Sequence, residues 1–208
     1  SAARNEGIRK TKSQWIAFLD SDDEWLPQKI EKQLFELTRQ PMHKLIHCDE
    51  VWIRNGVRVN PMNKHKKSGG DIFESCLPLC AISPSASIIQ RELLLEVGLF
   101  DESLPACEDY DLWLRICSRY PVLYVNEKLL RKYGGHEDQL SRQHWGMDRF
   151  RVDALDRIIR GGFLQSGQVK AARDILTNKC RILISGADKR GNQELLDKYQ
   201  ALLSMHQE

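Results

Sequence analysis

The segment that decides the fold reads Trp15-Ile16-Ala17-Phe18-Leu19-Asp20-Ser21-Asp22-Asp23. Five consecutive apolar residues are typical of a buried central strand in an α/β sheet. The apolar run stops at an acidic turn, and Pro27 then stands where the first turn of a helix tolerates proline. Apolar residues recur at helical spacing from Ile30 to Leu37. The segment therefore predicts a strand, an acidic turn and a helix.

The following residues predict a mixed sheet. Asn55-Gly56 is a strong hairpin signal, so we expect the strand before it to return antiparallel. Residues 60–70 are rich in Pro, Gly and Lys, which predicts a mobile loop of the kind that often covers an active site. The expected strands are residues 45–53, 57–59, 85–89 and 122–125, and the expected helices are residues 91–97 and 108–120.

The last third of the chain contains only helical patterns. They cover residues 148–160, 167–183 and 193–205 and are separated by breaks that contain glycine. We therefore expect an α/β unit over residues 1–142 and an all-helical extension over residues 143–208.

Composition indicates a folded, globular chain without an obvious polyanionic partner. Of 208 residues, 41% are hydrophobic and 29% are charged, which is enough apolar material for a core. The net charge is only +2, so we predict no nucleic-acid partner. No apolar run resembles a membrane span or a signal peptide. We expect a cytoplasmic location, with peripheral association at the inner face of the membrane left open. The six cysteines form no CxxC pair, and most of them are expected to be reduced, half-buried core residues.

The acidic turn has the composition of a cation site. Asp20 and Asp22 point the same way from an extended backbone, at the end of a strand where open α/β sheets bind ligands. Adjacent carboxylates repel unless a cation or hydrogen-bond donors neutralise them. An oxygen-only cluster suits Mg²⁺ or Mn²⁺ shared with substrate phosphates. The alternative is a solvated turn that caps the following helix.

Two other classes of protein use similar acidic patterns. An EF-hand needs glycine at its sixth position, which here is Trp25, so this class is excluded. A phosphoaspartyl phosphatase also has an apolar strand followed by Asp-x-Asp, but its next turn is rich in Gly and Thr. This chain continues with Glu24-Trp25-Leu26-Pro27 instead, and the phosphatase remains a competing interpretation.

A second acidic pair, Glu108-Asp109, opens the helix expected at residues 108–120. Carboxylates at a helix N-terminus are stabilised by the helix dipole and by free N–H groups, so capping explains the pair. The functional alternative is a general base that takes a proton from an acceptor hydroxyl. The pair alone does not decide between these interpretations.

Four motifs in order resemble family 2 glycosyltransferases of the GT-A fold, over approximately residues 1–141. The motifs read Ala3-Arg4-Asn5-x-Gly7-Ile8, Ile16-Ala17-Phe18-Leu19-Asp20-Ser21-Asp22-Asp23-x-Trp25-x-Pro27, Gly98-Leu99-Phe100-Asp101-Glu102 and Glu108-Asp109-Tyr110-Asp111-Leu112-Trp113-Leu114-Arg115. The resemblance implies a Rossmann-like GT-A mixed sheet flanked by helices. Family members begin with strands and turns that form much of the nucleotide pocket and are missing here. We therefore expect an N-terminally truncated core followed by the helical extension.

The resemblance also implies roles for the acidic residues. Asp109 matches the catalytic base of these inverting enzymes, and Glu108 matches its partner. Asp22 matches the direct metal ligand of the Asp-x-Asp motif, and Asp20 matches a contact with the donor ribose or with the metal shell.

The remaining site predictions concern basic and polar residues. Arg4 and Asn5 match a segment near the donor nucleotide. His136 lies where relatives have a loop that closes over the diphosphate, so it is a candidate ligand for metal or phosphate, or else surface decoration. The run from Lys64 to Lys67 is interpreted as a solvated basic loop, with attraction of a phosphorylated or anionic acceptor as the alternative.

The activity implied by the resemblance is inverting transfer of a sugar from a nucleotide-diphosphate donor to an acceptor hydroxyl. A UDP-sugar is the favoured donor, a glycan or lipid-linked molecule is the acceptor, and Mn²⁺ or Mg²⁺ assists, in surface polysaccharide or glycan synthesis. The alternative function is a catalytically incompetent binding module. The helical extension is then a docking surface, and it is also a candidate surface for a homodimer.

Overall fold

The structure is a computed structural model that describes residues 1–135 and 146–206. Within these ranges one six-stranded mixed sheet has the order β1-β5-β3-β6-β2, and β4 pairs with β3. The long central pair β3 and β6 is parallel, whereas the other pairs are antiparallel, so the predicted mixed sheet is confirmed. The strands are β1 (Trp15–Ala17), β2 (Glu24–Trp25), β3 (Leu45–Arg54), β4 (Val57–Val59), β5 (Ser87–Gln90) and β6 (Leu123–Gly134).

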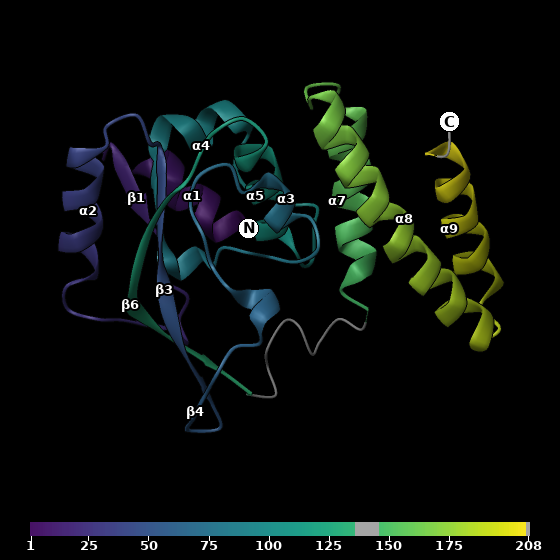
Figure 1. Cartoon of the computed structure of the whole chain (residues 1–208), viewed down its shortest axis with the longest axis horizontal. Helices are drawn as coiled ribbons and strands as arrows, with labels where there is room; N and C mark the ends of the chain where they lie inside the picture. Colours follow the sequence, from purple (N-terminus) through teal and green to yellow (C-terminus); the bar gives the residue numbers. More distant parts are fainter. Residues whose placement is uncertain (136–145, 207–208) are drawn as a thin grey trace.

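Helices cover both faces of the sheet (Figure 1). One face packs against α2, and the other packs against α1, α4 and α5. The helices are α1 (Ala2–Lys10), α2 (Lys29–Arg39), α3 (Phe73–Cys76), α4 (Arg91–Val97), α5 (Glu108–Cys117), α7 (Asp148–Arg160), α8 (Ser166–Lys189) and α9 (Gln193–Met205), with 3-10 turns η1 (Asn63–His65) and η2 (Pro84–Ala86). Beyond residue 146 the described chain is helical, as predicted.

The strand before the acidic turn is not the central strand that the sequence predicts. β1 stands at one end of the sheet order, and its one strand partner among the described residues is β5. Its apolar run has another physical cause. Trp15 and Ala17 pack against one hydrophobic cluster, whereas Ile16 and Phe18 belong with the other, so both faces of an edge strand are covered. A continuous apolar run therefore indicates that both faces of a strand are covered, and it does not indicate that the strand is central in the sheet.

The strand predicted at residues 122–125 is much longer in the structure. β6 runs for 12 residues, from Leu123 to Gly134. Its register against β3 shifts between Val125 and Leu130, where polar residues interrupt the apolar pattern. A β-bulge thus lets one strand pass through a segment that has the composition of a turn.

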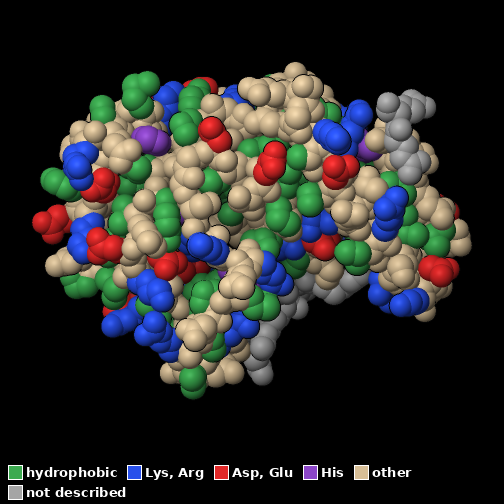
Figure 2. All heavy atoms as spheres, in the orientation of Figure 1, with side chains coloured by type: hydrophobic (Ala, Val, Ile, Leu, Met, Phe, Trp, Pro, Cys, Tyr) green, Lys and Arg blue, Asp and Glu red, His purple; other side chains and the backbone are tan. Residues whose placement is uncertain are grey.

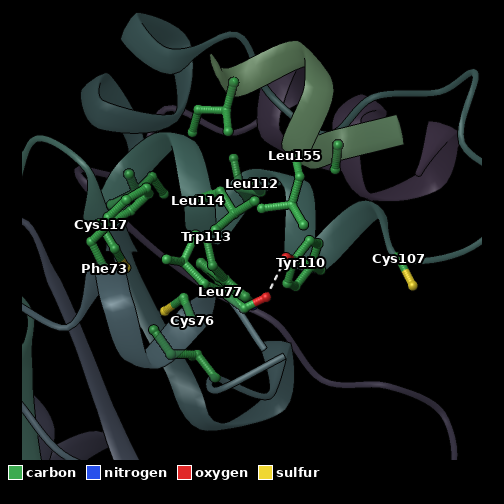
Figure 3. Packing of buried hydrophobic residues seen from close by; sticks show 14 of the residues in the cluster. Phe73, Cys76, Leu77, Cys107, Tyr110, Leu112, Trp113, Leu114, Cys117 and Leu155 are labelled. Carbon is green, nitrogen blue, oxygen red and sulfur yellow. Dashed lines mark hydrogen bonds between the residues drawn. The ribbon is translucent and has the colours of Figure 1, made fainter. Parts of the chain in front are cut away.

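The centre of the core is α5, which the structure buries on almost every side. Figure 3 shows Trp113 packed among the neighbouring apolar side chains, and Tyr110 donating a hydrogen bond to the carbonyl oxygen of Leu77 (2.6 Å). The same hydrophobic cluster includes Leu155 of α7. The domain boundary at residue 142 remains a prediction, because apolar packing is continuous across it.

All six cysteines are free thiols, and five of them are fully buried, which agrees with the prediction of reduced core residues. None of the helices in the described ranges has both the length and the apolar character needed to cross a membrane.

Truncation of Leu155 tests whether α7 belongs to the cooperative core. Leu155→Ala should lower the free energy of unfolding by about 2–5 kcal/mol, because it leaves a cavity at a fully buried site. Chemical denaturation followed by far-UV circular dichroism should show one transition moved to lower denaturant. The control is Ile182→Ala on α8, at a side chain that is 64% exposed, which should change stability by less than about 0.5 kcal/mol. A separate early transition, with the main one unmoved, would contradict the prediction.

Candidate active site

Arg4 joins the two acidic motifs that lie far apart in the sequence. Its Nη1 donates a hydrogen bond to Oε1 of Glu108 (2.8 Å), and its Nη2 donates to Oδ1 of Asp20. Burial lowers the pKa of Arg4, but the surrounding carboxylates outweigh this effect and hold the pKa above its ordinary value. The guanidinium therefore remains charged, and three of the predicted site residues meet at one point.

Asn5, the neighbour of Arg4, is almost fully buried and faces the protein interior. Its side-chain amide donates to the carbonyl oxygen of Phe100 (2.8 Å) and to Oε1 of Glu102 (2.8 Å), and its Oδ1 accepts from the Phe100 N–H (3.0 Å). These bonds attach α1 to the loop after α4. The predicted contact of Asn5 with the donor remains a prediction, whereas its observed contacts position α1.

Ser85, which precedes β5, anchors the acidic turn. The Asp20 N–H donates to the Ser85 hydroxyl (3.0 Å), and the indole N–H of Trp25 donates to the Ser85 carbonyl oxygen (2.8 Å). Asp23 accepts a hydrogen bond from the Tyr133 N–H of β6 (3.2 Å). Burial raises the pKa of Asp23, and the neighbouring carboxylates of the turn add to the rise. The turn is therefore held on both sides by the sheet.

Lys29, at the start of α2, is a buried cation beside this turn. Its side chain is 0% exposed, its Nζ lies 4.6 Å from the centre of the Trp25 ring, and this Nζ has no hydrogen-bond partner among the described residues. Burial lowers the pKa of Lys29 to about 8.

Asp109 is held in a defined orientation in the first turn of α5. Its Oδ1 accepts from the Tyr110 N–H (2.7 Å), and its Oδ2 accepts from the thiol of Cys80 (3.1 Å). Burial and the charge of Asp109 raise the pKa of Cys80 well above its usual range, so the thiol keeps its proton and acts as the donor. Both oxygens of the predicted base are thus oriented by the protein.

The same carboxylate lines a cleft of about 970 Å³. The cleft runs from Asp109 past β6 to the β3–β4 hairpin and the turn around η1, and α7 and α8 close its other side. Figure 2 shows Lys and Arg side chains gathered over the lower part of the α/β core, near that hairpin. Among the described residues, seven cationic side chains line the cleft: Arg54, Lys64, Lys66, Lys67, Lys132, Arg151 and Lys179.

The acidic turn has the donor set of a metal that is shared with a nucleotide. Such an ion takes one or two protein carboxylates and draws its other ligands from phosphate and water. Asp20 and Asp22 supply two carboxylates on one turn, with Asp22 exposed. No group of three metal-ligating side chains occurs among the described residues, and a metal at the acidic turn remains a prediction. His136, the other predicted ligand, lies outside the described residues.

Sequence reasoning missed several residues of the site. Cys80 and Ser85 are brought to Asp109 and Asp20 by contacts across 29 and 65 positions, which no local pattern reports. Lys179 could have been identified from the sequence, because it is the one charged residue in the buried stripe of α8. A single charge in an apolar helical stripe indicates a buried partner.

The sheet topology, the acidic turn at its edge and the carboxylate at the start of α5 place the chain in the GT-A class of α/β folds. The model of the family described as "Glycosyltransferase like family 2" matches residues 1–154. This match covers well over half of the chain, and the chain belongs to that family.

Relatives of known sequence carry the same designation. An uncharacterised glycosyltransferase of Rickettsia prowazekii is 31% identical over 202 residues, which cover 89% of this chain and 55% of the relative. A second one, from Rickettsia typhi, is 29% identical over 191 residues, with the same coverages of 89% and 55%. The amylovoran biosynthesis glycosyltransferase AmsE of Erwinia amylovora is 26% identical over 152 residues, covering 69% of this chain and 53% of AmsE. This chain spans about half the length of these relatives.

Two solved structures share the fold. S. aureus TarS 1-349 superposes with a TM-score of 0.58 at 14% identity, over 91% of this chain and 52% of that one. The mannosyltransferase PcManGT from Pyrobaculum calidifontis, in complex with GDP-Man and Mn²⁺, superposes with a TM-score of 0.55 at 13% identity, over 99% of this chain and 62% of that one.

Replacement of Lys29 tests how much the burial of its positive charge lowers the free energy of unfolding. Because the folded-state pKa of about 8 lies below the ordinary 10.5, the cost is fully present below pH 8 and disappears as pH rises toward 10.5. Lys29→Met should therefore raise the free energy of unfolding at pH 7, by at most about 3 kcal/mol.

Urea denaturation of both proteins from pH 7 to 10.5 measures this difference, which should shrink across the range. Lys12→Met, at an exposed position, is the control and should track the wild type. A difference that stays constant with pH would show that packing, and not charge, separates the variants.

Proposed function

We propose that this chain carries the catalytic part of a metal-assisted inverting glycosyltransferase. It moves a sugar from a nucleotide diphosphate, with a UDP-sugar favoured, to the hydroxyl of a glycan or lipid-linked acceptor. The observation that carries this proposal is the Arg4 bridge. By binding both Asp20 and Glu108, Arg4 holds the Asp-x-Asp turn next to the helix start whose Asp109 faces the cleft.

The donor belongs on the side of the acidic turn. In this proposal Asp22 would hold Mn²⁺ or Mg²⁺ directly, and Asp20 would contact either the donor ribose or the metal shell. The ion, when bound, neutralises the charge that develops on the nucleotide diphosphate as it leaves. Arg4 orients Asp20 through their ion pair. Asn5 holds α1, and with it Arg4, against the loop at Phe100.

The acceptor hydroxyl belongs on the cleft side, where Asp109 removes its proton. The hydroxyl oxygen forms a bond to the anomeric carbon as the bond to the nucleotide diphosphate breaks on the opposite face, which inverts the configuration. Cys80 and the Tyr110 N–H hold the carboxylate, so little rotational freedom is lost when the acceptor binds. Glu108 stays paired with Arg4 and orients the helix start.

The relatives and structural neighbours support this assignment. TarS has been crystallised with UDP and PcManGT with GDP-Man and Mn²⁺, so both nucleotides occur on this fold. The name of AmsE supports a role in polysaccharide synthesis.

Loss of the metal ligand tests the donor side. The wild-type chain should bind UDP-glucose or GDP-mannose in calorimetry only when Mn²⁺ is present, and Asp22→Ala should weaken this binding by at least tenfold. Asp188→Ala, at an exposed position on α8, is the control and should bind like the wild type. If the folded wild-type chain binds neither nucleotide sugar with Mn²⁺, the proposed transferase function fails for this chain.

Neutralisation of the base tests the acceptor side. Asp109→Asn should leave Mn²⁺-dependent donor binding within about twofold, while release of UDP or GDP from the bound donor falls by roughly 10²–10⁴-fold. Calorimetry and a coupled nucleotide-release assay measure the two quantities on the same preparation. Asp188→Asn serves as the matched control. Equal losses of binding and release would instead assign Asp109 a structural role.

A further inference from the structure

The cleft beside Asp109 contains a carboxylate that two cations share. Arg151 donates from Nη1 to Oδ1 of Asp148 (2.8 Å), and Nζ of Lys179 lies 2.8 Å from the same oxygen. The side chains of Arg151 and Lys179 are 23% and 10% exposed. The single negative charge of Asp148 is therefore shared by two cations whose side chains are largely shielded from solvent.

The opposite wall repeats this arrangement. Nζ of Lys67 lies 3.3 Å from Oε2 of Glu50, and both side chains are almost fully buried. Lys132 donates to the hydroxyl of Ser83 (2.9 Å), and Glu50 also acts on its charge. Burial lowers the pKa of Lys132, but the carboxylates around it outweigh the effect and hold the pKa above its ordinary value. Lys67 and Lys132 thus share Glu50, and the charges of Asp23 and Asp109 also act on Lys132.

Among the described residues, the cleft carries a surplus of positive charge. Its seven described Lys and Arg side chains compare with three described carboxylates, Glu50, Asp109 and Asp148. Two histidines also line the cleft, His47 and His65. Burial lowers the pKa of His47 to about 3 and also lowers the pKa of His65, so both rings are neutral at pH 7. Arg54, Lys64 and Lys66 are exposed, whereas the other four cations are largely buried. Buried cations without full neutralisation are costly to keep, which indicates a function for these four beyond folding.

The excess positive charge lies on the side of Asp109 where the acceptor is proposed to bind. Asp109 lines the cleft, whereas Asp20 and Asp22 of the acidic turn do not. Two carboxylates attract a metal and its nucleotide to that turn, so the cations of the cleft face the other substrate. Arg and Lys are the side chains that bind phosphate oxygens most strongly, through charge-assisted hydrogen bonds.

We infer that the cleft binds an acceptor that carries a phosphate group close to the hydroxyl that receives the sugar. This inference rests on the proposed function, because that function makes Asp109 the base. A phosphate matches two opposed cation pairs because it offers at least three acceptor oxygens and up to two negative charges. A neutral sugar would leave both pairs unneutralised.

Calorimetry with glucose 6-phosphate, glucuronate and glucose tests the inference on the full chain in a buffer free of phosphate. Glucose 6-phosphate should bind at least tenfold more tightly than glucose, and more tightly than glucuronate. The preference should persist when Mn²⁺ and UDP or GDP are present at saturation. Equal binding of the three sugars would overturn the inference. Loss of the preference on adding nucleotide would also overturn it, because the cations would then belong to the donor.

Variants on the two walls separate ligand binding from a structural role. Arg151→Gln and Lys132→Gln should each weaken binding of glucose 6-phosphate by roughly ten- to a hundredfold, with glucose unaffected. Lys189→Gln, at an exposed position on α8, is the matched control and should change binding by less than twofold. Thermal melts establish which variants are folded. Because the two substitutions lie on different elements, misfolding of one variant leaves the other to test the inference.

Two outcomes distinguish this inference from the proposed function. If both folded wall variants keep the preference for glucose 6-phosphate, the cations only hold α7 and α8 to the core, and the inference is overturned. If the wall variants lose it while the wild type binds no nucleotide sugar, the anion site stands and the transferase function fails.

Discussion

The ion pairs of Arg4 are the constraint on which the candidate site depends. One guanidinium binds Asp20, 16 positions away, and Glu108, 104 positions away. Asp109 follows Glu108 directly, so the place of the proposed base is set through this bridge. Breaking a partly buried ion network costs more than breaking an exposed pair, because it leaves an unneutralised charge in low dielectric. The bridge therefore gives the acidic turn and the start of α5 a fixed separation.

Much of the fold follows from local patterns, and the departures have identifiable causes. The helical spacing and the Asn55-Gly56 turn report local geometry, and the structure confirms both the helices and the β3–β4 hairpin. The position of β1 in the sheet was predicted wrongly, because an apolar run is the same whether a strand is central or is an edge strand covered on both faces. The length of β6 was missed because its bulge places polar residues where the apolar pattern should continue.

The candidate site shows the same difference between local motifs and residues that distant segments bring together. The acidic turn and Glu108-Asp109 are contiguous motifs, so sequence reasoning selected them without knowledge of the fold. Their partners come from distant segments: the thiol of Cys80 and the hydroxyl of Ser85 lie in short stretches with no pattern of their own. Lys179 differs from these two residues. A lysine in the buried stripe of α8 costs too much to be accidental, and its position alone predicts that a carboxylate or carbonyl lies opposite.

In the proposed reaction, the charges around Asp109 separate two substrates that both carry phosphate. The nucleotide diphosphate would approach the acidic turn together with a divalent cation, because the carboxylates repel it otherwise. A phosphorylated acceptor meets the opposite field in the cleft, where the cations attract it directly and would repel a metal ion. In this proposal Asp109 lies between the acidic turn and the basic cleft. Each substrate binds on the side whose charge attracts it, so the two substrates do not compete for one site.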